Sequence, residues 1–302
     1  MTHRVWIDGI ALWSPTMPGW DIARAALRGE PTPPLQPASR PAPSLLAANE
    51  RRRAPDAVLL ALEVASHALA ASGHSASTVA SVFASTHGDL AVTDALCTTL
   101  AGDPLLLSPT RFHHSVHNAA SGYWAIGSGS AAASTALAAF NETFATGLLE
   151  ACVQCTADAQ AVLLVACDTE ASGALRSVNR SRGLLAVALL LAPVRGAASG
   201  WALDWSVQDA SVAVPVLHSA AARALADNAT AAALPLFEAL AADASCRLAW
   251  PDASCTPAWP DASCTPAWPD ASCRLAWPLS ASRSLHLVLQ PLAAEAPRAP
   301  AA

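Results

Sequence analysis

The sequence has little charge. Only 13% of its residues are Asp, Glu, Lys or Arg, and the formal net charge is −6. Proteins bind phosphate backbones through clustered Lys and Arg side chains, so this composition excludes a general nucleic-acid-binding surface. The one basic cluster, Arg51, Arg52 and Arg53, is too short to change that conclusion. It precedes a predicted helix, where the three side chains are either solvated or hold a carboxylate.

Long hydrophobic runs are also absent. The most apolar run, residues 183–194, is too short to cross a bilayer, which takes about 20 residues. The N-terminal residues lack the basic start and long apolar core of a secretory signal. We therefore expect a cytoplasmic protein with no membrane span, and mostly reduced thiols rather than disulfides among its eight cysteines.

What the sequence does contain is a series of apolar strands alternating with helices. At 302 residues, 53% of them hydrophobic, the chain can bury a large core. We predict a layered α/β domain, a mixed sheet flanked by helices. The clearest predicted helix covers residues 56–72 and ends at Gly73. Short helices are predicted at residues 216–227 and 233–242. A Gly/Pro-rich loop reaches about residue 48, and a mixed loop region precedes residue 118. Predicted strands lie within residues 5–15, 79–89, 134–140, 161–170, 184–193, 201–208 and 285–290.

Four nine-residue units interrupt this pattern between residues 243 and 278. They read DASCRLAWP, DASCTPAWP, DASCTPAWP and DASCRLAWP, so that Cys and Trp recur every nine residues. The prolines and the single cysteine per unit fit neither a β-helix nor the paired spacing of zinc ligands. We therefore predict a main domain (residues 1–242), a tandem-repeat loop insertion (243–278), and a final strand with a disordered tail (279–302). The alternative is a metal-binding or redox module.

The stretch STALAAFNETFATGLLEA, residues 134–151, predicts a strand that turns sharply into an amphipathic helix. Asn141 lies at the turn, and Asn is among the best residues for capping a helix N-terminus. Phe144, Leu148, Cys152 and Cys155 then share one helical face. We predict that Asn141 caps this helix and that both cysteines of the C-x-x-C pair pack in the core.

The order of these segments resembles the N-terminal half of β-ketoacyl synthases, which have the thiolase-like fold. The resemblance covers residues 5–208 and rests on VWIDGIALWSP, the arginine run, SVFASTHGD, and NAASGYWAIGSGSAAASTALAAFNETFATGLLEA followed by VLLVACDTE. Gly122, Ile126 and Gly129 match glycine and isoleucine positions of the family pattern. The sequence is most similar to the shortened ketosynthase or chain-length-factor proteins of aryl-polyene-type pathways.

The resemblance places the catalytic cysteine of the family on Asn141. An amide is no substitute for a thiolate, because it has no comparable nucleophilicity and no proton to lose near neutral pH. The second half of such enzymes supplies two histidines, but His218 and His286 lack the motifs around them. The resemblance therefore implies no standalone condensing activity, no cofactor and no metal.

The role implied instead is that of a non-catalytic, chain-length-factor-like partner in fatty-acid or polyketide chain elongation. Its partners would be a ketosynthase subunit, in a heterodimer formed through the strand before Asn141, and an acyl carrier protein. Phe140 and Phe144 are predicted to limit acyl chain length, and Asn141 to donate a hydrogen bond to an acyl carbonyl. His117 and Asn118 are predicted to contact the acyl chain or the carrier's phosphopantetheine.

One alternative is an independent acyltransferase or hydrolase that uses a hydroxyl or an imidazole in place of the missing thiol. Its candidate residues are Ser134 and Thr135 on the predicted strand and the histidine cluster at 113, 114 and 117. A zinc site in that cluster would need a further ligand such as His87 or Asp89.

Overall fold

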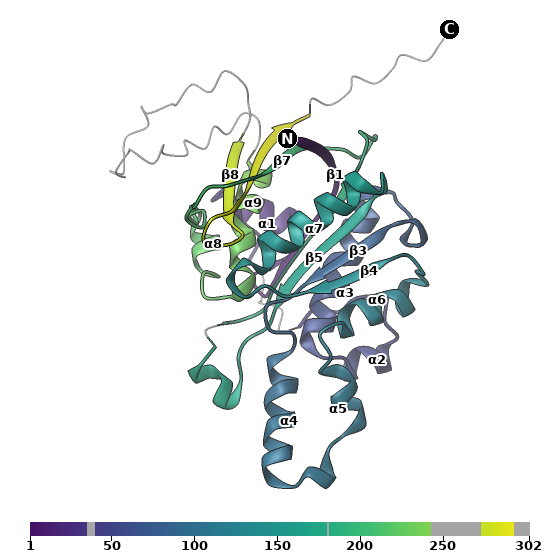
Figure 1. The fold of residues 1–302 in the computed structure, drawn as a ribbon. Coiled ribbons are helices and arrows are strands. Elements are labelled where there is room, and N and C mark those ends of the chain that lie inside the picture. Colours follow the sequence, from purple (N-terminus) through teal and green to yellow (C-terminus); the bar gives the residue numbers. More distant parts are fainter. Residues whose placement is uncertain (35–39, 180, 243–272, 293–302) are drawn as a thin grey trace.

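A computed structural model describes residues 1–34, 40–179, 181–242 and 273–292 of the chain. In these residues the centre of the molecule is a nine-stranded mixed sheet in the order β4-β3-β5-β6-β1-β7-β9-β8, with β2 paired to β1 (Figure 1). Strand β3 is parallel to β4 and β5, whereas the other pairs are antiparallel. The strands are β1 His3–Ser14, β2 Met17–Pro18, β3 Ala80–Ala84, β4 Ser134–Leu137, β5 Val162–Asp168, β6 Leu185–Ala192, β7 Trp201–Gln208, β8 Cys273–Pro278 and β9 Ser284–Pro291.

Helices cover both faces of the sheet, which confirms the predicted α/β architecture (Figure 1). Helices α3 and α6 pack on one face, and α1, α7 and α9 pack on the other. In the described part of the chain no helix is long and apolar enough to cross a membrane. The helices are α1 Trp20–Leu27, α2 Ala48–Arg53, α3 Asp56–Ser72, α4 Leu90–Gly102, α5 Pro109–His114, α6 Ala119–Ser128, α7 Thr143–Ala157, α8 Ala220–Arg223 and α9 Leu234–Ala241.

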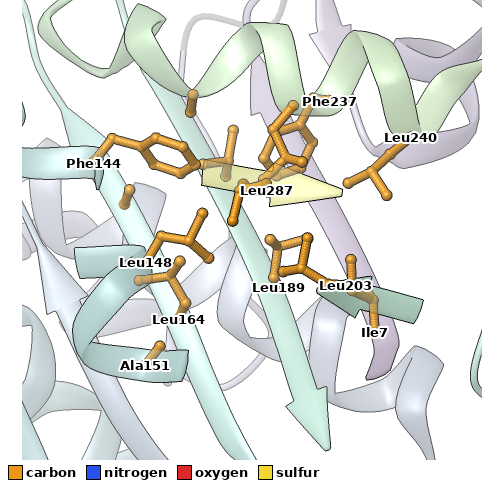
Figure 2. Packing of buried hydrophobic residues seen from close by; sticks show 14 of the residues in the cluster. Ile7, Phe144, Leu148, Ala151, Leu164, Leu189, Leu203, Phe237, Leu240 and Leu287 are labelled. Carbon is orange, nitrogen blue, oxygen red and sulfur yellow. The ribbon is translucent and has the colours of Figure 1, made fainter. Parts of the chain in front are cut away.

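The central strands are buried on both faces. Every residue of β5 and of β6 is buried. Because successive side chains point to opposite faces, Leu164 packs under α7 while Leu163 and Val165 pack under α3. Figure 2 shows the α7 side, where Phe144, Leu148 and Ala151 lie over Leu164 and Leu189. A strand that is buried on both faces is a continuous apolar run in the sequence, which is why β5 and β6 are well predicted from it.

Several segments differ from the predictions. The predicted Gly/Pro-rich loop contains helix α1, whose Ala23 and Leu27 are buried against the core. The mixed loop region contains α4 and α5, which project together from the body (Figure 1). The predicted helix at 216–227 is reduced to α8. Local sequence is a weak guide to such helices, because tertiary contacts can override helix propensity.

The repeat insertion also ends earlier than predicted. The last six residues of the fourth unit, Cys273–Pro278, form strand β8 and pair with β9. Leu275 and Trp277 are buried in the core, and the Trp277 Nε1–H group donates to the Ala232 carbonyl at 2.8 Å. These residues therefore belong to the sheet and not to a loop. The first three units and the predicted tail at 293–302 lie outside the described residues.

Helix α3 lies very close to strand β1 at Gly9. The pairing of β1 with β6 shifts by one residue between Ile7 and Gly9, a β-bulge at Asp8. A Cβ atom on Gly9 would overlap the carbonyl oxygen of Ala68 in α3. The absence of a side chain at this position is what allows α3 to lie against β1.

Replacing Gly9 with alanine is expected to destabilise the protein by about 1–3 kcal/mol, because the main chain of α3 must shift to admit a methyl group. Gly122→Ala is the matched control, since Gly122 lies in α6 with open space around its Cα and alanine favours a helix. Urea unfolding at equilibrium measures the free energy of unfolding of both variants. Equal stability of the two variants would contradict this account of α3 packing.

Candidate functional site

The three parallel strands β3, β4 and β5 bring their carboxyl ends to one edge of the sheet. In α/β sheets, ligands bind in crevices outside the carboxyl ends of the strands. Here that edge holds the loop Ser85–Asp89 after β3, the turn from Ala138 to Thr143 after β4, and Asp168 at the end of β5. We take this edge as the candidate site.

Asp168 fixes the loop after β3. It is 1% exposed and accepts hydrogen bonds from Ser85 Oγ at 3.0 Å, Thr86 N at 3.2 Å, His87 N at 3.1 Å and Thr230 Oγ1 at 2.9 Å. Burial raises the pKa of Asp168, and these four donors oppose the shift. The carboxyl group therefore ties together β5, the loop after β3 and the 3-10 turn Ala229–Ala233.

The loop that Asp168 holds also orients His117. The Nε2 atom of His117 lies 2.8 Å from the Ser85 carbonyl oxygen, which can only accept, so Nε2 carries the proton. Both His117 and the neighbouring Asn118 are exposed. These two predicted site residues therefore lie at the surface next to the carboxyl end of β3.

The turn after β4 has a strained backbone. Phe140 has φ of 50°, in the left-handed region of backbone conformations that residues other than glycine rarely adopt. Buried Thr143 holds it there: its Oγ1 accepts from Ala139 N at 2.9 Å and donates to the Phe140 carbonyl at 2.7 Å. The prediction that Asn141 caps the helix is wrong. Helix α7 begins at Thr143, Asn141 lies in the preceding 3-10 turn, Phe140–Glu142, and the local polar contacts come from Thr143.

The two phenylalanines near this turn have different surroundings. The Phe140 side chain is 82% exposed. Phe144, one helical turn further on, is buried and its ring packs edge-on against Trp277 of β8, with 5.9 Å between ring centroids. The strained turn therefore presents Phe140 and Asn141 to the outside and directs Phe144 into the core.

No thiol lies at this turn. Cys152 and Cys155 are both fully buried in α7, as predicted, and burial raises the pKa of Cys155 to about 12. The hydroxyls of Ser134 and Thr135 have other partners: Ser134 Oγ accepts from Ser81 Oγ at 2.9 Å, and Thr135 Oγ1 accepts from Gln154 Nε2 at 3.0 Å. Neither hydroxyl has a histidine as hydrogen-bond partner, so neither is paired with a base.

The histidine cluster is divided between two environments. Buried His114 has its Nε2 atom 3.0 Å from the Tyr123 hydroxyl. Burial and the neighbouring His113 lower the pKa of His114, which favours the neutral ring. His117 instead bonds to the loop after β3. Among the residues with described positions, no group of three or more His, Cys, Asp or Glu side chains is arranged to hold a metal. The repeat cysteines Cys246, Cys255 and Cys264 lie outside those residues.

A family model for the β-ketoacyl synthase N-terminal domain matches residues 25–259. The chain belongs to this family. Its mixed sheet with helices on both faces, and its strand turning into α7, form the thiolase-like fold that the sequence resemblance implies. Comparison with curated protein sequences gives no match.

Solved structures agree with this fold. The complex of the ketosynthase ApeO with its chain length factor ApeC from Xenorhabdus doucetiae aligns with 20% identity and a TM-score of 0.63, covering 95% of this chain and 99% of that chain. The ishigamide ketosynthase/chain length factor aligns with 15% identity and a TM-score of 0.64, covering 96% and 100%. Both matches extend over nearly the whole of each chain.

Sequence reasoning missed two residues that shape this edge. Asp168 ends an apolar strand, and a polar residue at a strand's carboxyl end is a signal that could have identified it. Thr143 lies two residues after Asn141 and forms the local side-chain hydrogen bonds to the backbone that were predicted for Asn141. Its role depends on the 3-10 turn, which nothing in the local sequence indicates.

Replacing Phe140 with glycine is expected to raise stability by up to about 1 kcal/mol, because glycine adopts positive φ without steric cost. Phe140→Ala keeps the strain and is expected to leave stability unchanged. Phe144→Ala, which empties a core position, is expected to cost about 3–5 kcal/mol. Chemical denaturation of the three variants measures this order, and a destabilised Phe140→Gly variant would contradict the strain at the turn.

Proposed function

We propose that the protein is a non-catalytic, chain-length-factor-like partner of an active ketosynthase in fatty-acid or polyketide-type acyl chain elongation. The observation that carries the proposal is the turn after β4. It has the strand-to-helix form of a nucleophile elbow, yet it presents Asn141 where the family pattern has a cysteine. In each of two solved ketosynthase and chain length factor structures, one chain aligns with this chain over almost its entire length, which supports the proposal.

Strand β4 offers an edge for the proposed partner. The carbonyls of Ala133 and Leu137 accept from Ser81 N at 2.9 Å and Ser85 N at 3.2 Å, so the odd-numbered backbone groups of β4 face β3. The backbone groups of Ser134 and Ala136 consequently face away from the sheet. Among the described strands β4 ends the sheet order, so these groups are available to a strand of the ketosynthase.

The projecting arm formed by α4 and α5 is a second surface that exposes apolar side chains. Most of α4 is apolar, yet Leu90 and Leu96 are its only buried residues. A largely apolar helix with so little burial is typical of an interaction surface. We include the arm in the proposed interface. The large apolar side chains exposed on it and on the turn that follows are Leu100, Leu105, Leu106, Phe112 and Val116.

Within such a heterodimer the predicted site residues take distinct roles. Phe140, held outward by the strained turn, would project toward the partner's acyl tunnel and limit chain length, with Phe144 packed behind the same turn. Asn141 would donate a hydrogen bond to an acyl carbonyl. His117 and Asn118, exposed beside the carboxyl end of β3, would contact the phosphopantetheine of an acyl carrier protein.

Co-expression with the ketosynthase encoded nearest to it is expected to yield a heterodimer on size-exclusion chromatography. Ala136→Pro should abolish that heterodimer, because proline removes an outward N–H from β4 without removing a bond to β3. Ala136→Ser is the matched control and should assemble normally. A stable monomer that never co-purifies with the ketosynthase, or an Ala136→Pro variant that pairs like the wild type, would argue against the proposal.

The rival function, an independent acyltransferase or hydrolase, predicts a reactive group in this chain. On our proposal an acyl-thioester probe and a fluorophosphonate probe leave the wild-type protein unlabelled, whereas Asn141→Cys gains acyl-thioester labelling at residue 141. Intact-protein mass spectrometry measures the extent of labelling, and peptide mass spectrometry identifies the labelled residue. Stoichiometric labelling of the wild type at Ser134, Thr135 or a histidine would instead establish the rival.

A further inference from the structure

The arm formed by α4 and α5 is joined to the body at its root and through each of its helices. At the root, Asp89 precedes α4 and accepts a hydrogen bond from Ala57 N of α3 at 3.1 Å. On the α5 side, His114 Nε2 lies 3.0 Å from the Tyr123 hydroxyl of α6. On the α4 side, the contact is with the loop that follows β5, and it involves residues outside the candidate site.

The loop after β5 is closed at its base by hydrogen bonds. Ala171 is fully buried, and its N–H donates to the Ser181 carbonyl at 3.0 Å, which joins the two ends of the loop. Within the loop, Arg176 donates from Nε to the Ala171 carbonyl and from Nη2 to Glu170 Oε1, each at 2.9 Å. The loop therefore has a structure that its own hydrogen bonds stabilise, and α4 packs against it.

The contact with α4 is made at Gly173, where the loop has no room for a side chain. A Cβ atom on Gly173 would overlap both carboxylate oxygens of Asp94. Gly173 also has φ of 50°, which glycine adopts without steric cost. Beside it, Ser172 Oγ lies 3.5 Å from Asp94 Oδ2 and 3.5 Å from the Leu90 carbonyl oxygen. The Asp94 carboxylate of α4 therefore lies directly on the loop backbone at the start of the 3-10 turn Gly173–Ser177.

We propose that this contact is a latch that sets the position of the arm, and that Asp94 and Gly173 are positioning residues for the partner that docks on the arm. The inference rests on the proposed function, in which the arm is part of the interface with a ketosynthase. The latch loop continues β5, which ends at Asp168, and Asp168 also holds the loop after β3 from which α4 starts. The arm and the candidate site consequently share one support, the carboxyl end of β5.

A latch affects binding because association has to overcome the entropy of ordering the surface that is recognised. A partner that must first fix the orientation of a mobile helix loses affinity. With Asp94 seated on the loop, the arm presents its exposed Leu100, Leu105 and Leu106 in one arrangement before the partner arrives. Loss of the latch is therefore expected to weaken binding without disturbing the core.

Gly173→Ala tests the latch in the isolated protein. The added methyl group displaces the Asp94 carboxylate, and we expect the backbone amides of α4 to exchange with deuterium about two- to tenfold faster, the factor for losing one net interaction. Gly29→Ala is the matched control, because Gly29 has φ of 72° with open space around its Cα, so alanine there adds a similar backbone strain without the overlap. Equal exchange of α4 in the two variants would overturn the latch.

A double-variant cycle shows whether Asp94 and Gly173 act through one contact. Asp94→Ala alone is expected to speed exchange in α4 as Gly173→Ala does, and the double variant is expected to exchange no faster than either single variant, because all three lack the same contact. Thr98→Ala is the control for helix propensity at an exposed position of α4. Additive effects of the two substitutions, or unchanged exchange in Asp94→Ala, would contradict the inference.

Binding to the ketosynthase shows whether the latch positions the arm for the partner. By isothermal titration calorimetry, Gly173→Ala is expected to bind about two- to tenfold more weakly than Gly29→Ala, with the same free energy of unfolding in urea. If Gly173→Ala speeds exchange in α4 but binds with full affinity, the positioning role is wrong and the proposed function stands. A wild-type chain that binds no ketosynthase would instead refute the proposed function, and the positioning role with it.

Discussion

Burial of β5 and β6 on both faces is the constraint on which the rest of the structure depends. Two neighbouring strands without a single exposed residue require helices above and below them. Helix α3 meets this need on one face and can approach closely because Gly9 has no side chain. On the other face α7 shares the task with α9 and with Trp277 of β8. The C-terminal strands β8 and β9 therefore contribute to the hydrophobic core and are not an appendage to it.

The same arrangement explains why a functional edge can exist beside so apolar a core. The parallel strands end together, and polar backbone groups of the loops beyond them must be satisfied. Asp168 does this from the end of β5, with donors from the loop after β3 and from Thr230. Thr143 likewise forms hydrogen bonds with the backbone groups of the turn after β4. Because these two side chains hold the backbone, Phe140 is directed outward and the Ser85 carbonyl is placed to accept a hydrogen bond from His117.

The sequence predicts the parts of this structure that follow from periodicity. The apolar runs of β5 and β6, the alternation in β7, and the helix ending at Gly73 all agree with the structure. Helix α1 and strand β8 were missed because their stability comes from contacts far away in sequence, such as that between Trp277 and Ala232. The first and fourth units have the same sequence, so nothing local distinguishes the copy that pairs with β9 from the first one.

The candidate site was predictable in its location and less so in its detail. The resemblance to β-ketoacyl synthases leads to residue 141, and the structure places that residue at a strand-to-helix turn. The capping role given to Asn141 failed because a 3-10 turn separates it from the helix, so that Thr143 makes the bonds. The positive φ at Phe140 could not be anticipated, since phenylalanine has no preference for that conformation.

The position of β8 at the end of the repeat has a consequence for heredity. Each unit corresponds to a whole number of codons, so unequal recombination between units changes the length of the gene without shifting its reading frame. A loss that joins the start of the first unit to the end of the fourth restores one intact DASCRLAWP ahead of β9. The number of units can therefore change while strand β8 at the edge of the sheet stays the same.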